Sequence, residues 1–228
     1  MTTIAQRSQA ILSQIENTTL AADRPAGCVT LIAVSKTHAA PLLREAYDAG
    51  LRDFGESYLQ EALDKMQQLA DLPLVWHFIG PIQSNKTRPI AESFSWVHGV
   101  DRLKIAQRLA ESRPDNLPPL NVCLQVNISG EASKAGCTPD ELLVLAQAVG
   151  TLPKLRLRGL MAIPEPTTGI VKQRQNFKIL AQLLESLNQQ GLRMDTLSMG
   201  MSGDFVSAIM EGSTMVRIGT AIFGQRYA

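Results

Sequence analysis

The chain has 228 residues, 45% of them hydrophobic, and its 22 Lys and Arg residues against 21 Asp and Glu residues give a formal charge of +1. This composition supports a sizeable core and provides no long-range attraction to nucleic acid or to an anionic membrane. The three cysteines, Cys28, Cys123 and Cys137, lack the paired spacing of zinc or redox sites, which predicts free thiols in the cytoplasm. No signal peptide and no membrane-spanning run is expected, because polar residues interrupt every apolar stretch.

From the amino terminus onward, short β-rich runs alternate with helical patterns. A helix is expected at 2–20, ahead of the first strand. Strands are predicted near 28–35, 52–55, 75–79, 95–98, 120–127, 157–161, 195–199 and 215–219. Helices are predicted between them near 39–49, 56–70, 82–92, 101–112, 138–149, 170–190 and 202–211.

Several of these helices have clear start and stop signals. Pro41 suits a first helical turn, Asp101 suits an N-cap, and Thr138 combines a cap with a following proline and acidic residues. Glycines stand where helices should end, at Gly50, Gly150 and Gly191. Eight strands with helices between them, and no linker or low-complexity tract, predict one α/β domain over residues 1–228, a (β/α)8 TIM barrel with an extra N-terminal helix.

The working surface of such a barrel lies at the carboxyl ends of its strands, and the distinctive residues of this chain gather there. A small-residue turn at 198–203 follows the seventh predicted strand, and Gly219 and Thr220 follow the eighth. Turns of this kind expose backbone N–H groups and suit a phosphate. Lys36 ends the first predicted strand, so its amine should lie beside that phosphate. A phosphate cradle with a lysine indicates pyridoxal phosphate.

Short motifs along nearly the whole chain resemble those of the pyridoxal-phosphate homeostasis proteins, the YggS or PROSC type. The matching stretches lie at 33–37, 54–56, 77–80, 83–86, 125–131, 134–136, 159–161, 197–202 and 223–224. The resemblance implies a single barrel similar to the N-terminal barrel of alanine racemase, with pyridoxal 5'-phosphate held covalently at Lys36 as a Schiff base. Arg217 is implied as the partner of the pyridine nitrogen. Since an arginine cannot accept a proton there, the cofactor would be a poor electron sink.

The same resemblance implies where the phosphate binds. Ser202, Gly219 and Thr220 correspond to the phosphate cup, and Ser198 is expected to add to it. Ser57 stands where the family usually has asparagine, so this chain keeps a hydroxyl there and lacks an amide.

Plainer structural roles are open for most of these side chains. Lys36 could extend along an apolar surface to solvent, and Arg217 could pair with Glu56 or Asp204 as scaffolding. Met161 could be a core residue or could pack against a flat ring. His77 and His98 are interpreted as packed strand residues, and no metal site is predicted. Three basic residues, Lys86, Arg88 and Lys134, form either a rim to the cofactor mouth or ordinary solvated charge.

Three functions remain open on these grounds. The favoured one is a monomeric carrier that holds pyridoxal phosphate, supplies it to recipient apo-enzymes, and so influences amino-acid and keto-acid balance without robust catalysis. The alternative is an amino-acid racemase that uses the same lysine, although the chain ends at Ala228 without the second domain of alanine racemase. A weaker third possibility is a barrel enzyme that acts on a phosphorylated metabolite without pyridoxal phosphate.

Overall fold

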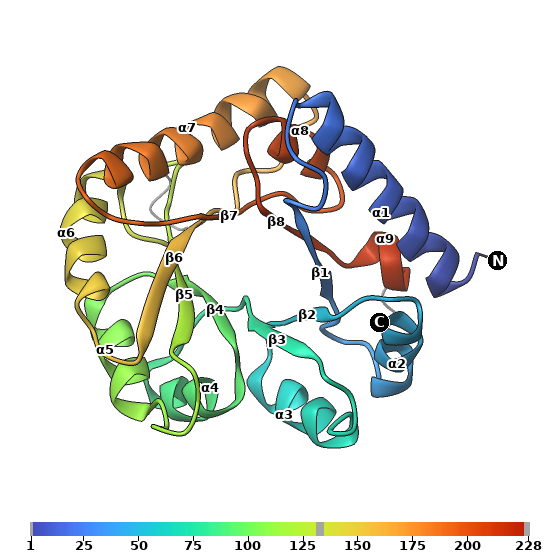
Figure 1. The fold of residues 1–228 in the computed structure, drawn as a ribbon, viewed down its shortest axis with the longest axis horizontal. Helices are drawn as coiled ribbons and strands as arrows, with labels where there is room; N and C mark the ends of the chain where they lie inside the picture. Colours follow the sequence, from blue (N-terminus) through green and yellow to red (C-terminus); the bar gives the residue numbers. More distant parts are fainter. Residues whose placement is uncertain (1, 131–134, 226–228) are drawn as a thin grey trace.

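The computed structural model describes residues 2–130 and 135–225, which form a closed barrel of parallel strands (Figure 1). The strands follow one another around the barrel in chain order, and the last pairs with the first. They are β1 (Thr30–Val34), β2 (Asp53–Glu56), β3 (Val75–Phe78), β4 (Trp96–Val100), β5 (Leu120–Gln125), β6 (Leu155–Met161), β7 (Thr196–Ser198) and β8 (Met215–Ile218). The predicted TIM barrel is therefore confirmed.

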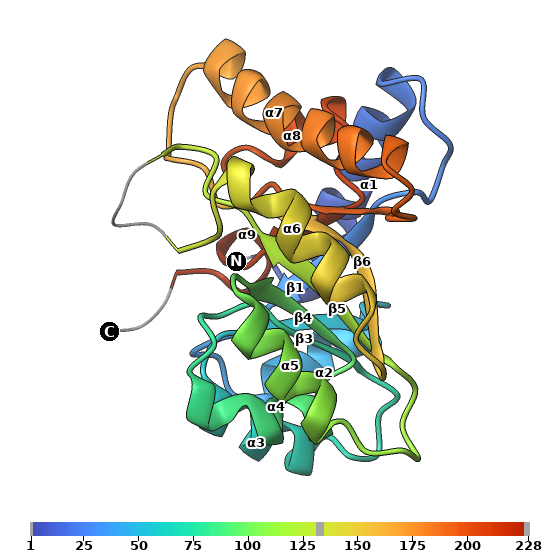
Figure 2. The ribbon, with the colours of Figure 1, turned by 90° about the vertical axis from the view of Figure 1, so that its left-hand side faces the viewer.

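Helices cover the outside of this barrel, and Figure 2 shows α6 and α7 running alongside it. Their bounds are α1 (Ile4–Ala21), α2 (Ala40–Asp48), α3 (Leu59–Gln68), α4 (Thr87–Ser93), α5 (Leu103–Ser112), α6 (Pro139–Gly150), α7 (Ile170–Gln189), α8 (Phe205–Met210) and α9 (Thr220–Phe223), with a 3-10 turn η1 (Ser84–Lys86) before α4. Each helix predicted from the sequence lies close to its expected range. Within residues 2–130 and 135–225, none of them combines the length and apolar character that crossing a bilayer requires.

The helix α1, predicted as an addition to the barrel, completes the ring of helices. It packs against α8, α9 and α2, so it covers the wall where β8 meets β1 (Figure 1). The helix that follows β8, α9, has only four residues and is too short to cover that wall. Arg7 of α1 ties the two together, because its Nε donates to the carbonyl oxygen of Ile222 at 2.6 Å.

Most of the predicted helix signals act as expected. Pro41 lies in the first turn of α2, and Thr138 forms a capping box with Glu141 at the start of α6. The N-cap prediction for Asp101 is wrong: Arg102 occupies the N-cap position of α5 without a capping bond from its side chain, and the Asp101 carboxylate pairs with the Arg102 guanidinium at 2.9 Å. Gly50 and Gly191 follow helices at φ +98° and +94°, whereas Gly150 is the last residue within α6.

The core has two parts, one between the strands and the helices and one inside the barrel. The larger part fills the space under the helices. The smaller consists of Ile32, Trp96, Cys123, Met161 and Met215, which come from strands that are not all neighbours. Side chains from such strands can meet only across the barrel interior. The interior is thus a packed core, and the open working surface lies at the strand ends.

Candidate functional site

The residues predicted to form the site lie at one end of the barrel, on five consecutive strands from β6 through β8 and β1 to β2. Met161 ends β6, Ser198 ends β7, and Ser202 lies in the loop after β7. Arg217 lies in β8, and Gly219 and Thr220 follow that strand. Lys36 follows β1, and Ser57 follows β2. Parallel strands bring their carboxyl ends to the same edge of a sheet. The structure therefore places the whole predicted set toward one end of the barrel, although only Lys36 and Ser57 line the same cavity.

Lys36 lines a cavity of about 680 Å³ at this end of the barrel. The other lining residues come from the loop after β2 and the start of α3, from the end of β3 and the loop after it, from η1 and α4, and from the loop after β6: Ser57, Tyr58, Leu59, Gln60, Phe78, Ile79, Gly80, Pro81, Gln83, Lys86, Ile90 and Ile163. Among the described residues, Ser202, Gly219 and Thr220 are not part of this lining. Lys36 thus borders an open cavity on one side, and the two small-residue turns occupy the neighbouring strand ends.

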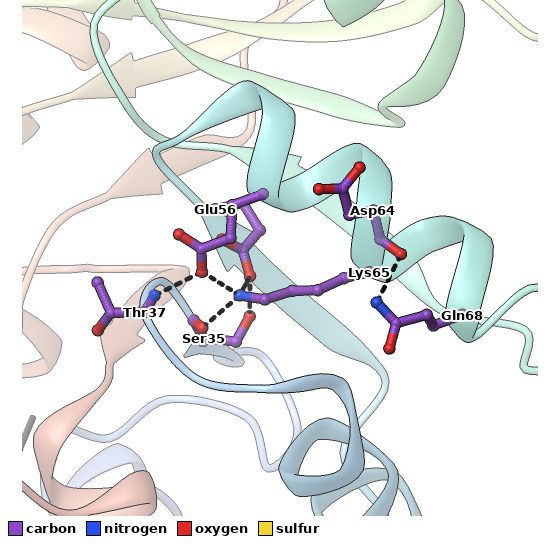
Figure 3. Close-up of polar contacts among 7 residues, drawn as sticks. Ser35, Thr37, Glu56, Asp64, Lys65 and Gln68 are labelled. Atoms are coloured by element: carbon purple, nitrogen blue, oxygen red, sulfur yellow. Dashed lines mark hydrogen bonds and ion pairs between the residues drawn. The ribbon is translucent and has the colours of Figure 1, made fainter. Parts of the chain in front are cut away.

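The loop that carries Lys36 is anchored by a buried amine, that of Lys65 on α3 (Figure 3). The Lys65 Nζ donates to the Ser35 carbonyl oxygen at 2.7 Å and to Oε1 of Glu56 at 2.8 Å. It also pairs with Oε1 of Glu61, which accepts the Thr37 N–H at 2.6 Å. We call Ser35, Glu56, Glu61 and Lys65 the Lys65 cluster.

Burial makes the charges of the Lys65 cluster costly to leave unpaired. The Glu56 side chain is 0% exposed and that of Lys65 is 5% exposed. Burial raises the pKa of the Glu56 carboxyl, and hydrogen bonds from Lys65 and Ser35 partly offset that rise. Oε2 of Glu56 has no hydrogen-bond partner in the described structure. The cluster fixes Ser35 and Thr37, the residues on either side of Lys36, the second of them at φ +67°.

The first small-residue turn is held by Gly200 and by Asp204. Gly200 has φ +96°, and a Cβ there would lie 2.7 Å from the Cβ of Ala208, so no other residue fits without a shift. The Met201 N–H donates to Oδ1 of Asp204 at 2.6 Å. Ser202, at the tip of the turn, is exposed. Its hydroxyl is accessible to a ligand.

The second turn lies against β1, close to the Lys36 loop. A Cβ on Gly219 would lie 3.1 Å from the carbonyl oxygen of Val34, the last residue of β1. Thr220 begins α9 and is exposed. The first N–H groups of a helix have no acceptor within that helix. Exposed hydroxyls and backbone donors therefore lie at the ends of β7 and β8, and β8 pairs with β1, the strand that precedes Lys36.

Arg217 lies inside the barrel and donates to neighbouring strands. Its Nη1 contacts the carbonyl oxygen and Oγ of Ser198 at 2.6 and 2.7 Å, and its Nη2 contacts the Ala162 carbonyl oxygen at 3.0 Å. Burial lowers its pKa to about 10, and the carboxylate of Asp204 opposes that change. The predicted scaffolding pair with Glu56 is wrong, because Glu56 pairs with Lys65. Among the described residues no carboxylate lies within 4.0 Å of this guanidinium.

Ser198 continues from Arg217 into a line of buried polar side chains. Its Oγ lies 2.8 Å from Nδ1 of His98, and Nε2 of His98 lies 3.0 Å from Nδ1 of His77. Nε2 of His77 lies 2.9 Å from Oδ1 of Asp53. The interpretation of both histidines as packed strand residues is confirmed, and burial lowers the pKa of each. We call Asp53, His77, His98, Ser198 and Arg217 the interior chain.

Other predicted side chains have simpler positions. Met161 is fully buried in the apolar cluster inside the barrel. Lys86 lines the cavity, whereas Arg88 is exposed and pairs with Glu92 at 2.8 Å. Lys134 lies outside the described residues.

Two features of the cavity were not predicted as site residues. Ile163, 43% exposed, forms part of the wall, and nothing in its local sequence distinguishes it. A Cβ on Gly80 would lie 2.5 Å from the carbonyl oxygen of Ser57, so this glycine allows the loops after β2 and β3 to touch. Gly80 does belong to the motif at 77–80, which is the signal that could have identified it.

The cysteines are free thiols, as predicted. Burial raises the pKa of Cys123 to about 12 and that of Cys137 to about 11, so neither thiol is activated at neutral pH. Within the part of the chain that the structure describes, no three His, Cys, Asp or Glu side chains are grouped as a metal ion would require.

Comparisons with known proteins agree with the barrel fold. Residues 9–227 match the family model of the alanine racemase N-terminal domain. A protein of Pseudomonas aeruginosa, named pyridoxal phosphate homeostasis protein, is 64% identical over 226 residues, which cover 99% of this chain and 97% of that protein. The solved structure of PipY from Synechococcus elongatus, with PLP bound, is 38% identical and has a TM-score of 0.86, with 97% of this chain and 100% of that chain covered.

A more distant solved structure shares only the fold. Alanine racemase from Corynebacterium glutamicum has a TM-score of 0.68 at 17% identity, and the match covers 96% of this chain but 62% of that enzyme.

Proposed function

Because the chain belongs to the alanine racemase N-terminal domain family, and within it to the pyridoxal phosphate homeostasis proteins, we propose that it binds pyridoxal 5'-phosphate as a cytoplasmic, monomeric carrier. The cofactor is held as a Schiff base on Lys36 and is supplied to recipient apo-enzymes. One observation carries the proposal: Lys36 borders a cavity at the end of β1, and exposed hydroxyl and backbone donors follow the adjacent strand β8.

The donor set fits pyridoxal phosphate. The ligand combines an aldehyde, a phosphate dianion and a pyridine nitrogen, and when bound it supplies a carbonyl that reacts with a primary amine. Lys36 provides the amine, and Ser202 and Thr220 provide accessible hydroxyls. Gly219 lets the backbone after β8 approach β1 closely, which a larger residue would hinder. Arg217 provides a buried donor between these groups and the barrel interior.

We assign the phosphate to Ser202, Gly219 and Thr220, at the ends of β7 and β8. Charge-assisted hydrogen bonds from hydroxyls and from the first amides of α9 would hold the dianion there. Ser57 lines the cavity with Lys36 and is assigned a contact with the ligand, and Met161 forms the apolar floor under the site. Ser198 contributes through Arg217, to which its hydroxyl is bonded.

Arg217 favours a carrier over a racemase. Its terminal nitrogens use three N–H groups in bonds to Ser198 and Ala162, which leaves the Nε–H and the second N–H of Nη2; we assign the Nε–H to the pyridine nitrogen. A guanidinium keeps its own proton at neutral pH, so the ring nitrogen accepts a hydrogen bond without becoming charged. An uncharged ring withdraws electrons weakly, and the protein thereby protects a bound cofactor from side reactions with amino acids.

Spectroscopy and peptide mapping test the binding mode. Purified protein with pyridoxal phosphate should absorb near the visible edge, and borohydride reduction should place the pyridoxyl group on the peptide that contains Lys36. Lys36→Ala should lose the reducible adduct and retain weaker, noncovalent binding. Lys86→Ala, which changes another lysine of the same cavity, should keep the adduct. An adduct found on Lys86 alone would overturn the assignment.

Transfer and turnover test the carrier role. Loaded protein should pass pyridoxal phosphate to an added apo-enzyme, and α-hydrogen exchange of L-alanine in deuterium oxide should stay near that of free cofactor. Steady turnover of about 1 per second or faster, at the low end of ordinary enzymes, would contradict the proposal and favour the racemase. Sedimentation at several protein concentrations tests the monomer.

A further inference from the structure

The interior chain crosses the barrel from one side to the other. Asp53 begins β2, His77 and His98 lie in β3 and β4, and Ser198 and Arg217 lie in β7 and β8. The bond between His98 and Ser198 joins strands three positions apart in the closed order, so it runs through the interior. The four links of the interior chain measure 2.9, 3.0, 2.8 and 2.7 Å from Asp53 to Arg217.

The two ends of the interior chain fix the direction of every hydrogen bond in it. A guanidinium can only donate, so Ser198 Oγ accepts from Arg217 and must direct its own proton elsewhere. An ionised carboxylate can only accept, so His77 donates to Asp53 from Nε2 and accepts at Nδ1. His98 then donates from Nε2 to His77 and accepts the Ser198 proton at Nδ1. All four donors point from Arg217 toward Asp53.

The histidines of the interior chain are fully buried beside an apolar cluster. Trp96 stacks on His77 with ring centroids 5.7 Å apart, and it packs with Ile32 and Met215 inside the barrel. In such a medium hydrogen bonds strengthen one another and an unpaired partner is costly. Burial lowers the pKa of both histidines, which agrees with the neutral rings that this direction requires.

We propose that Asp53, His77, His98 and Ser198 are positioning residues for Arg217, whose guanidinium they fix as a donor to the ring nitrogen of the bound cofactor. This inference rests on the proposed function for the role of Arg217. The interior chain links a buried cation to the partly exposed carboxylate of Asp53 at the amino-terminal end of the barrel. The Ser198 hydroxyl, turned toward His98, is an acceptor for Arg217 and donates no bond to phosphate.

The direction of the interior chain is testable by nitrogen NMR on the protein without ligand. At pH 7 both His77 and His98 should be neutral and protonated at Nε2, and the His→Gln variants assign the signals. An Nδ1-protonated or doubly protonated ring at either position would break the donor order and overturn the proposal.

The positioning role is testable from the far end of the interior chain. Asp53→Leu removes the final acceptor, whereas Asp53→Asn retains an oxygen that can accept from His77. The probes are pyridoxal phosphate and its 1-deaza analogue, in which C–H replaces the ring nitrogen. Asp53→Leu should reduce the preference for pyridoxal phosphate over the analogue about tenfold, the scale of one buried hydrogen bond, and Asp53→Asn should restore most of it.

A matched control separates positioning from general damage. Asp195 directly precedes β7 at the same barrel end, but it pairs with Arg158 at 2.8 Å outside the interior chain. Asp195→Leu should change the binding affinity of both probes by the same factor, so the ratio of their two affinities should stay the same. An unchanged ratio in Asp53→Leu would overturn the inference. If the unaltered protein bound neither probe, the proposed function would fail instead, while the NMR result would still report on the interior chain.

Discussion

The two faces of β2 carry two buried polar networks with different chemistry. Asp53 and Glu56 are three residues apart in this strand, so their side chains point to opposite sides of the barrel wall. Asp53 begins the interior chain, and Glu56 belongs to the Lys65 cluster under α3. The outer network pairs charge with charge, while the inner one joins its two charges through neutral groups.

The difference follows from what each network supports. The Lys65 cluster fixes the backbone on both sides of Lys36, where a short, strong ion pair can hold a loop. The interior chain holds the guanidinium of Arg217, which needs a defined orientation and is surrounded by other strands. Neutral histidines and a hydroxyl carry hydrogen bonds across that space without the cost of burying further charges. A parallel strand can thus support two sides of one site at once.

The largest effect on stability is expected from a change in the Lys65 cluster. Lys65→Met leaves the Glu56 carboxylate buried without its cation, and breaking a buried pair from one side costs about 3–5 kcal/mol. Urea denaturation should show that loss in the free energy of unfolding at pH 8. The loss should shrink at lower pH, because Glu56 can then take up a proton.

The control for this prediction is an exposed ion pair on another helix. Arg88→Met removes the partner of Glu92, and the Arg88 side chain is 79% exposed. Its effect on unfolding should be small, since water screens such pairs. Equal effects of the two variants would show that burial of the Lys65 cluster contributes nothing.

The next effect concerns the phosphate turns, which belong to neither network. Ser202→Ala and Thr220→Ala each remove one exposed hydroxyl, so unfolding should hardly change. A charge-assisted hydrogen bond contributes about 1.5–3 kcal/mol, which predicts roughly tenfold to hundredfold weaker binding of pyridoxal phosphate in each variant. Calorimetric titration with pyridoxal, which lacks the phosphate, is the control and should show little change. Equal losses of affinity for both ligands would show that these hydroxyls support the structure of the turns and do not bind the phosphate.

The amino-acid sequence predicts the strand ends well but not the networks behind them. β-rich runs and small-residue turns are local signals, so the sequence alone places Lys36, Gly219 and Thr220 at strand ends. The interior chain depends on contacts such as that between His98 and Ser198, 100 residues apart, and no local pattern determines which side chains meet across a barrel. Lys65 resembles an ordinary surface lysine of an amphipathic helix in the sequence, because only the packing of α3 on β2 buries it.

The smallest effect concerns the pH dependence of the free energy of unfolding, to which the interior chain and the Lys65 cluster contribute with opposite sign as the pH falls. The pKa of His98 is lowered in the folded protein. Below about pH 6.5 the unfolded chain therefore binds a proton that the folded chain does not, and the free energy of unfolding decreases as the pH is lowered. The pKa of Glu56 is raised, so just above its unfolded value the folded chain retains a proton that the unfolded chain has lost, and stability rises as pH falls.

Each such group changes the free energy of unfolding by at most about 1.4 kcal/mol per pH unit. Denaturation at intervals between pH 7.5 and 5 compares the unaltered protein with His98→Phe and Glu56→Gln, and the other titrating groups are common to all three. His98→Phe should lose less stability on acidification than the unaltered protein, and Glu56→Gln should lose more. Slopes that change in the same direction would contradict a lowered pKa of His98 together with a raised pKa of Glu56 in the folded protein. Opposite changes in slope would show that burial acts with opposite sign on a base of the interior chain and on an acid of the Lys65 cluster.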